Sequence, residues 1–204
     1  MSDVLWTPSA DRIESTEIAK LCRSLGLRAS FAQLHDWSVQ QPTEFWETVW
    51  DRYGIIGERG APTIEAADRF RDTRFFPNAS LNVAENLLAA RIVDADTHEA
   101  MTFSNETGHV RSLTLTQLRA QVSVLQQAMK RAGVSVGDVV AAWLPNLPET
   151  MAIFMAANSL GAIFTSSSPD FGTNGVVDRF GQIEPTLLFA TDAYLYANKT
   201  HSTL

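Results

Sequence analysis

Serine, proline, aspartate and glycine meet in one short segment, "SSSPDFG", at residues 166–172. An apolar stretch precedes it and a segment with helical spacing follows, so we expect a strand, a loop and then a helix. In open α/β sheets, ligands bind beside loops of this kind, at the carboxyl ends of the strands. The first amides of the following helix have no backbone partner and attract a phosphate, a carboxylate or a thiolate. The segment is therefore a candidate ligand-binding loop.

The residues of the loop have different tasks. Pro169 restricts the backbone, and Gly172 allows a ligand or another segment to come close. Two interpretations of Asp170 remain open. It could cap the next helix, which contributes about 0.5–2 kcal/mol to stability, or it could contact a ligand.

Other residues that could perform chemistry are scarce. The histidines, His35, His98, His109 and His201, lack the spacing of metal ligands. Cys22 is the single cysteine, which excludes an internal disulfide and a CxxC pair. No G-x-S-x-G nucleophile motif occurs. We therefore expect no catalytic residue and no metal site in these residues.

Composition limits the class of protein. The chain has 204 residues, of which 45% are hydrophobic and 19% charged, which is typical of a globular domain with an appendage. Its formal net charge of −7 opposes nucleic-acid binding. The most apolar stretch, 151–164, is too short to cross a membrane, and the first residues lack the pattern of a signal peptide. These features favour the cytoplasm, with neither nucleic acid nor membrane as a partner.

Short helices joined by turns are expected in residues 1–95. The spacing of apolar residues predicts helices near 18–25 and 42–53, and residues 57–73 read as an irregular connector. Two capping boxes are predicted, Ser30 with Gln33 and Asn82 with Glu85. After the second box, the expected apolar face of the helix consists of Val83, Leu87 and Leu88.

The helix over 42–53 carries a stripe of Phe45, Trp46, Val49 and Trp50. Such a stripe could form an aromatic platform for a ligand. Its spacing is also that of an ordinary amphipathic helix, so we expect core packing.

In residues 96–204 the sequence pattern changes from short helices to strands that alternate with helices. A hairpin is expected around 105–108, and Thr114 with Gln117 begins a long helix that buries Leu118, Val122, Leu125 and Met129. Parallel strands are expected near 138–144, 162–166 and 186–190. One helix connects the first two strands, and another, with Val176, Val177, Phe180 and Ile183 as its apolar face, connects the last two. The fold class is thus α/β, a helical appendage followed by a β-hairpin and a β-α-β-α-β parallel sheet.

The segment "GVSVGDVVAAWLPNLPETMAIFMAANSLGAIFTSSSPDFG" resembles the opening of the adenylate-forming acyl-CoA synthetases. Within that family, "SPDFG" with "GVVDRFGQIEPTLLFATDAY" is similar to the acetoacetate–CoA ligases, as is "LHDWSVQQPTEFWETVWDRYGI". The resemblance spans nearly the whole chain. It implies that residues 1–95 are a helical N-terminal region and that 96–204 are the first part of the AMP-binding domain.

The resemblance implies a reaction in two steps that uses ATP, Mg²⁺ and coenzyme A. Acetoacetate first becomes an acyl-adenylate, with release of pyrophosphate, and the thiol of coenzyme A then displaces AMP. The resemblance also implies that Pro169, Asp170, Phe171 and Gly172 lie beside the pantetheine arm and that Lys199 contacts the phosphates of coenzyme A. Leu195 stands where an arginine is expected in such a ligase.

Several motifs of that family are absent from the sequence: the Ser/Thr/Gly-rich loop for the ATP phosphates, the aromatic-Gly-x-Thr-Glu segment, the ribose-binding aspartate and a C-terminal lysine. We therefore expect an N-terminal fragment that has no ligase activity alone. Two alternatives stay open: a non-catalytic module that binds coenzyme A or a nucleotide, and one half of a split ligase that needs a separate C-terminal chain.

A truncated sheet would leave apolar residues without cover. The third strand contains Leu187, Leu188 and Phe189, and the polar tail "NKTHSTL" is too short to cover a sheet. Exposed apolar faces and free sheet edges favour pairing with another chain. We therefore expect self-association through this surface.

Overall fold

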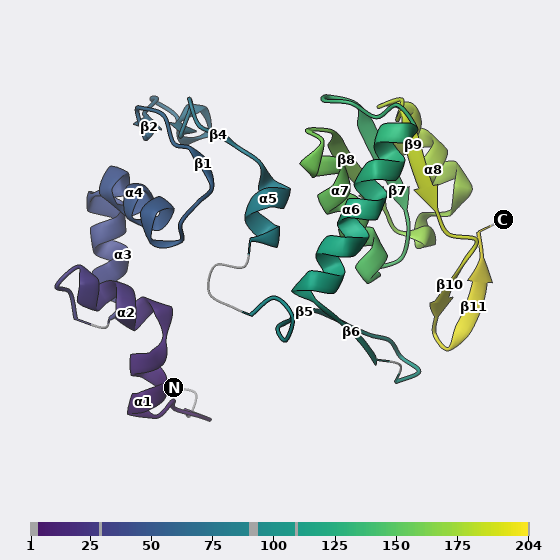
Figure 1. Cartoon of the computed structure of the whole chain (residues 1–204). Helices are drawn as coiled ribbons and strands as arrows, with labels where there is room; N and C mark the ends of the chain where they lie inside the picture. The colour runs from purple at the N-terminus through teal and green to yellow at the C-terminus, as the bar shows by residue number, and fades with distance from the viewer. Residues whose placement is uncertain (1–3, 29, 90–93, 109, 204) are drawn as a thin grey trace. The chain divides into compact units, whose positions relative to one another are not determined.

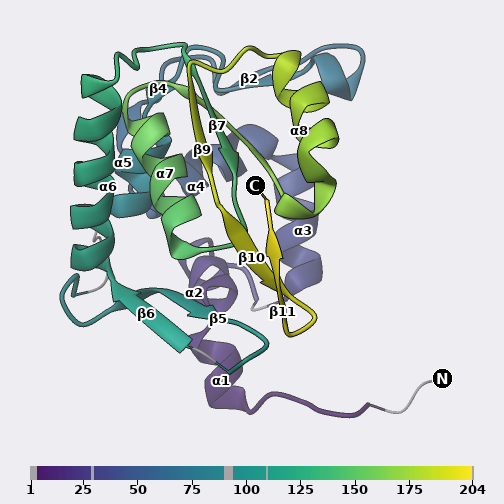
Figure 2. The same cartoon turned by 90° about the vertical axis from the view of Figure 1, so that its right-hand side faces the viewer.

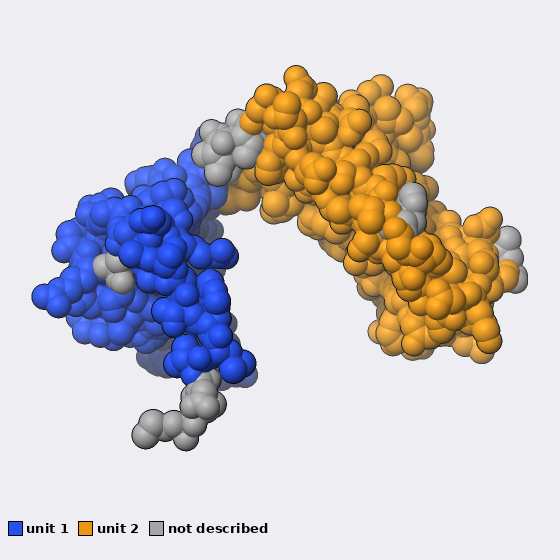
Figure 3. All heavy atoms as spheres, turned by 90° about the horizontal axis from the view of Figure 1, so that it is seen from below, with its two compact units in different colours: residues 1–80 blue, residues 81–204 orange. Residues whose placement is uncertain are grey.

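The computed structural model describes residues 4–28, 30–89, 94–108 and 110–203. These residues form two compact units, Met1–Ser80 and Leu81–Leu204 (Figure 3). His109, which sequence analysis considered as a metal ligand, lies outside the described residues. The place where the two functional regions meet, expected near residue 95, stays a prediction.

The first unit begins with helices and ends with very short strands. Its elements are α1 (Ala10–Ser15), α2 (Glu17–Ser24), α3 (Phe31–Gln40), α4 (Pro42–Arg52), β1 (Gly57–Glu58), β2 (Ile64–Glu65), the 3₁₀ turn η1 (Phe70–Asp72), β3 (Arg74–Phe75) and β4 (Ser80–Leu81). Strand β2 pairs with β3, and β1 pairs with β4. The predicted irregular connector over 57–73 is therefore partly wrong, because it contains paired strands that are too short to show an alternating pattern.

The first predicted capping box is wrong. Ser30 precedes α3, but its side chain makes no capping hydrogen bond. The Oε1 atom of Gln33 instead accepts a hydrogen bond from the amide of Arg28 at 3.0 Å. The Gln33 side chain therefore binds the amide of Arg28 and not the amide of Ser30, as a capping box would require.

The aromatic stripe of α4 packs against other aromatic rings. The ring of Phe45 contacts Trp37 at 5.9 Å between centroids, and that of Trp46 contacts Phe75 at 5.6 Å. Trp50 lies 5.1 Å from Phe76 by the same measure. These contacts support packing as the role of the stripe.

The second unit contains a three-stranded parallel sheet with strand order β8-β7-β9 (Figure 1). Its elements are α5 (Val83–Leu88), β5 (Glu99–Ser104), β6 (Val110–Thr114), α6 (Leu115–Arg131), β7 (Val139–Trp143), α7 (Pro148–Ser159), β8 (Ile163–Ser167), the 3₁₀ turn η2 (Pro169–Phe171), α8 (Gly172–Gly181), β9 (Leu187–Ala190), β10 (Ala193–Tyr196) and β11 (Lys199–Ser202). The β-α-β-α-β order predicted for this region is confirmed.

Helices cover both faces of the sheet (Figure 2). On one face, Val140 of β7 belongs to a buried cluster with residues of α6 and α7. On the other face, Ala141 and Trp143 of β7 pack against Val176 and Phe180 of α8. A strand that is buried on both faces is continuously apolar, as the sequence "VVAAW" is.

Helix α6 begins as predicted. The Thr114 hydroxyl accepts a hydrogen bond from the amide of Gln117, whose side chain accepts one from the amide of Thr114. Antiparallel strands β5 and β6 form the hairpin before it. An ion pair between Arg111 and Glu149, 2.7 Å apart, connects this hairpin to α7. The hydrogen bond from Arg111 holds the pKa of Glu149 below its usual range.

Helix α5 exposes two of the three residues that we expected to form its buried face. Val83 is 45% exposed and Leu87 is 52% exposed, whereas Ala84 is completely buried. The Asn82 side chain accepts from the amide of Glu85 at 3.1 Å and donates to the carbonyl of Asn158 at 3.0 Å. The second capping bond is thus confirmed. The predicted apolar face is right at Leu88, which packs against the buried cluster, but wrong at Val83 and Leu87, because the small Ala84 is the residue of α5 that is completely buried.

The chain after β9 forms a hairpin that sequence analysis did not predict. Strands β10 and β11 pair antiparallel, with Tyr194 opposite His201 and Tyr196 opposite Lys199 (Figure 1, yellow). The polar segment "NKTHSTL" is therefore mainly the second strand of a hairpin rather than a tail. Thr191 joins the hairpin to the sheet through a hydrogen bond from its amide to the carbonyl of Trp143, 3.1 Å long.

Apolar side chains remain exposed on the face that α8 covers. Leu188 is 49% exposed and Ile163 is 56% exposed, because α8 packs on the central strand and leaves the flanking strands open. Val177 and Ile183, which we expected to be buried, are exposed as well, and α8 ends before Ile183.

Leu187 and Leu188 form a matched pair for testing this arrangement, since neighbouring strand residues point to opposite faces. Leu187 packs against the buried cluster, so Leu187→Ala should reduce the free energy of unfolding by about 2 kcal/mol. Leu188→Ala should cost less than about 1 kcal/mol. Denaturant unfolding of both variants checks this, and equal losses would contradict the assignment of faces.

Candidate functional site

A pocket of about 250 Å³ lies at the carboxyl end of the parallel sheet. Its walls come from the end of β7, from η2 and the start of α8, and from the β10–β11 hairpin and the residue after it. The residues that line it are Trp143, Pro169, Asp170, Gly172, Thr173, Tyr194, Ser202 and Thr203. We call it the loop pocket.

The loop "SSSPDFG" forms one wall of the loop pocket. The Ser168 hydroxyl begins η2 by accepting from the amide of Asp170 at 3.4 Å, and it lies 3.2 Å from Asp170 Oδ2, to which it donates. Gly172 has φ +64°, a left-handed conformation that favours glycine. Open space surrounds the position that a Cβ would take there, so the backbone conformation is what requires glycine.

Asp170 does not cap the following helix. Phe171 occupies the N-cap position of α8, and no side chain there bonds the first amides. The capping interpretation is therefore wrong. Ser168, which precedes the proline, caps the short turn η2 instead.

Asp170 and Tyr194 both line the loop pocket, Asp170 from the turn η2 and Tyr194 from the hairpin. Burial of the phenol, together with a hydrogen bond to the Asp170 carboxylate and the charge of that group, raises the pKa of Tyr194 above its ordinary value. The Tyr194 ring also stacks on His201, with centroids 5.3 Å apart. The turn and the hairpin therefore meet at this pair of side chains.

Phe171 and Lys199 lie outside the pocket lining. The Phe171 ring is 53% exposed and lies against the guanidinium of Arg179, whose Cζ is 4.0 Å from the ring centroid. Lys199 is exposed at the start of β11, next to the turn of the hairpin. Of the residues predicted for the site, the structure thus brings Pro169, Asp170 and Gly172 together.

Comparison with known proteins identifies the family. Residues 90–204 match the family described as "AMP-binding enzyme". The chain belongs to the AMP-binding enzyme family.

Similar proteins within the AMP-binding family include acetoacetyl-coenzyme A synthetase of Rhizobium meliloti, which is 44% identical over 96% of this chain and 30% of its own length. Acetoacetyl-CoA synthetase of Xenopus tropicalis is 36% identical over 97% of this chain and 30% of its own length. The solved structure of acetoacetyl-CoA synthetase from Streptomyces lividans matches with a TM-score of 0.83 and 33% identity, over 98% of this chain and 32% of that chain. This chain therefore spans about 30% of the length of the curated relatives.

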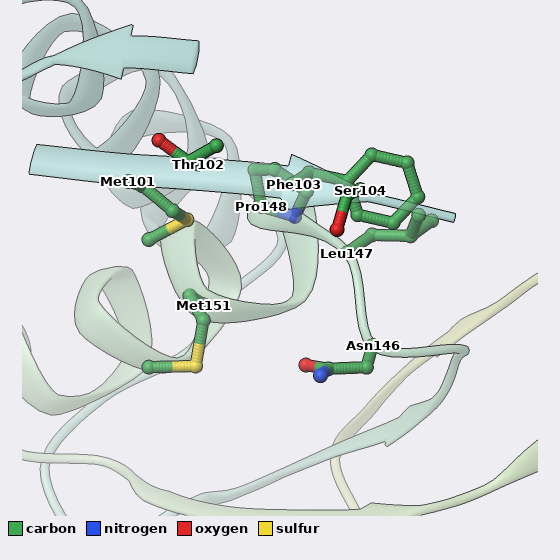
Figure 4. Close-up of a pocket in the computed structure, with 8 residues that line it drawn as sticks. All are labelled: Met101, Thr102, Phe103, Ser104, Asn146, Leu147, Pro148 and Met151. Carbon is green, nitrogen blue, oxygen red and sulfur yellow. The ribbon is translucent and has the colours of Figure 1, made fainter. Parts of the chain in front are cut away.

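A second cavity, of about 270 Å³, lies between β5 and the segment that joins β7 to α7. Figure 4 shows the residues that line it: Met101, Thr102, Phe103, Ser104, Asn146, Leu147, Pro148 and Met151. None of these side chains titrates near neutral pH, so the cavity offers polar contacts and thioethers but no acid or base.

Potential metal ligands do not cluster in the described part of this chain. Among residues 4–28, 30–89, 94–108 and 110–203, no group of three or more His, Cys, Asp or Glu side chains could hold a metal ion. Within the same residues, no helix is long and apolar enough to cross a membrane.

Several lining residues were missed by sequence reasoning. Trp143 ends a strand that was predicted, and its place opposite the loop follows from the parallel pairing of β7 with β8. Tyr194, Ser202 and Thr203 reach the pocket through the unpredicted hairpin. The apolar run "TLLFA" did not indicate that the chain after β9 would form a hairpin beside the carboxyl end of the sheet.

The interaction between Asp170 and Tyr194 predicts a titration. With Tyr53 and Tyr196 replaced by Phe, Tyr194 alone should titrate, at a pH above the ordinary value of about 10. Asp170→Asn removes the nearby negative charge and should lower the pKa of Tyr194, while Asp178→Asn serves as the matched control. Absorbance at alkaline pH measures both, and an unchanged pKa in Asp170→Asn would refute the interaction.

The raised pKa of Tyr194 also determines the direction in which folding stability changes with pH. Because folding raises the pKa of Tyr194, its stabilising contribution is present below the unfolded pKa and is lost as pH rises through the folded one.

Proposed function

We propose that this chain contributes the first part of an ATP-dependent acetoacetate–CoA ligase, with coenzyme A bound beside the loop pocket. The observation that carries the proposal is the convergence of Pro169, Asp170 and Gly172 on one pocket, in a chain similar along nearly its whole length to acetoacetyl-CoA synthetases. In the proposed organisation, residues 1–95 form the helical N-terminal region and 96–204 begin the AMP-binding domain.

The proposed reaction has two steps, and each step forms one bond and breaks another. A carboxylate oxygen of acetoacetate attacks the α-phosphorus of ATP, and pyrophosphate leaves. The sulfur of coenzyme A then attacks the acyl carbon, AMP leaves, and the thiol proton passes to solvent or to a base. Magnesium, bound to the ATP phosphates, would neutralise charge in the first step. The loop pocket would serve the second.

The charges of the loop pocket suit an uncharged part of coenzyme A. Among its lining residues, Asp170 is the charged one, and the others offer hydroxyls, an indole, a phenol and backbone groups. A phosphate inside would face the carboxylate of Asp170, whereas amide groups of the pantetheine arm would find hydrogen-bond partners. Lys199, outside the lining, is proposed to contact a phosphate of coenzyme A.

Self-association through the uncovered part of the sheet at its third strand, β9, also stays a proposal. It is supported by the exposure of Leu188, whereas Leu187 and Phe189 pack against the buried cluster. Sedimentation at several concentrations tests it, with Leu188→Ala compared against the wild-type chain. The cytoplasm remains the proposed compartment.

Disruption of the coding sequence tests the ligase proposal. Extracts of the organism that encodes the chain should lose pyrophosphate release that depends on acetoacetate, ATP and coenzyme A together. Release that depends on acetate should persist and serves as the control. Undiminished acetoacetate-dependent release would contradict the proposed function.

Calorimetric titration of the chain with coenzyme A tests the proposed site. Lys199→Ala should weaken binding of coenzyme A several-fold, because an exposed cation contributes modestly and is screened by salt. It should leave binding of pantetheine, which has no phosphate, unchanged. Lys130→Ala, an exposed lysine in the last turn of α6, is the matched control. Equal effects of the two substitutions would remove Lys199 from the site.

A further inference from the structure

The guanidinium of Arg179 is held in place beside the candidate loop. Its Cζ lies 4.0 Å from the centroid of the Phe171 ring. Its Nη1 donates a hydrogen bond to the carbonyl of Gly175 at 3.0 Å. A Cβ added at Gly175 would come within 3.1 Å of the same Nη1, so the space beneath the guanidinium is narrow. Two contacts thus orient the guanidinium of this exposed residue.

The charge of Arg179 is not neutralised by an ion pair. None of the salt bridges among the described residues includes it. In the same unit, Arg111 pairs with Glu149, and Arg119 donates to the carbonyl of Leu88. A guanidinium has five N–H donors and stays charged, so after the bond to Gly175 most donors of Arg179 remain available.

The ring under this cation belongs to the loop that lines a pocket, and the described residues that line this pocket include no cation. Phe171, the ring under Arg179, stands in the chain between Asp170 and Gly172, which both line the loop pocket. A ligand with an uncharged part and a phosphate could place the uncharged part in the pocket and the phosphate beside Arg179. Leu195, where the resemblance to acetoacetate–CoA ligases led us to expect an arginine, cannot supply that charge.

We propose that Arg179 binds a phosphate group of the ligand that occupies the loop pocket, with Phe171 and Gly175 holding the guanidinium ready for this contact. A planar guanidinium can donate two parallel hydrogen bonds to phosphate oxygens, which favours Arg over Lys in such a role. That the ligand is coenzyme A rests on the proposed function. The phosphate contact itself does not rest on the proposed function.

A purely structural role for Arg179 gives a different expectation. If the side chain only stabilised the loop through Phe171, its loss would disturb the pocket and weaken the binding of every ligand equally. If Arg179 contacts a phosphate, its loss should weaken the binding only of ligands that carry a phosphate. The comparison of a phosphorylated probe with an unphosphorylated one therefore separates the two roles.

The probes are the two parts of coenzyme A, tested separately on the 204-residue chain. Adenosine 3′,5′-bisphosphate carries phosphates, and pantetheine carries none. Arg179→Ala should weaken binding of the bisphosphate about tenfold or more, the loss expected for a hydrogen bond to a charged group. Pantetheine binding should not change. Arg179→Lys should recover part of the loss, because it keeps the charge but not the paired donors.

Two further variants sharpen the test. Arg131→Ala, an exposed arginine in the last turn of α6, removes the same charge away from the loop and should change neither affinity. Phe171→Leu removes the ring under the guanidinium and should weaken bisphosphate binding by a smaller factor than Arg179→Ala. Circular dichroism of each variant confirms that it folds.

Each outcome decides the inference. An equal loss for both probes, an unchanged affinity for the bisphosphate, or a wild-type chain that does not bind the bisphosphate would overturn it. If the bisphosphate binds through Arg179 while pantetheine and coenzyme A do not bind, the phosphate site stands and the placement of coenzyme A fails. The disruption experiment tests the ligase proposal independently of all these results.

Discussion

Burial of the central residues of strand β7 is the constraint on which the second unit depends. Val140, Ala141 and Ala142 have no exposed surface, with β8 and β9 paired on either side. Parallel neighbours require helical crossovers, and α7 and α8 supply them on opposite faces. The carboxyl ends of all three strands then meet at one edge, which is where Trp143, the loop and the start of the hairpin come together. The position of the loop pocket thus follows from the need to cover one apolar strand.

Strong local signals explain the elements that could be predicted. The run "VVAAW" is too apolar to be anything but buried, and the reciprocal bonds of Thr114 and Gln117 define a helix start with neighbouring residues alone. Predictions failed where a distant contact decided the outcome. Asn82, at the start of helix α5, donates to the carbonyl of Asn158, which is far away in the sequence, and the side-chain pattern of the helix did not reveal that Ala84 is its most buried residue. The sequence also offered no glycine to mark the turn of the last hairpin, where Ala197 and Asn198 adopt positive φ angles.

Some residues of the candidate site could also be predicted from the sequence, and others could not. Pro169, Asp170 and Gly172 could be selected because their residue types and their place between strand and helix point to a ligand loop. Their partners could not, because Tyr194 reaches the pocket only through cross-strand pairing with His201. Arg179 is a similar case: its distance from Phe171 in the sequence hides the fact that the side chain returns along α8 to the loop.

The bond between Asn82 and Asn158 has a consequence for how this protein can be divided. The AMP-binding match begins at residue 90, yet Ala84 lies in the same buried cluster as residues of α6 and α7, and Leu88 packs against it. A recombinant piece that starts at the family boundary would lose this helix and open a hollow beside α7. Sequence families record which residues share ancestry, whereas cooperative folding is set by which residues share a core. In this protein the compact unit that contains the parallel sheet begins at Leu81, ahead of residue 90, where the family match begins.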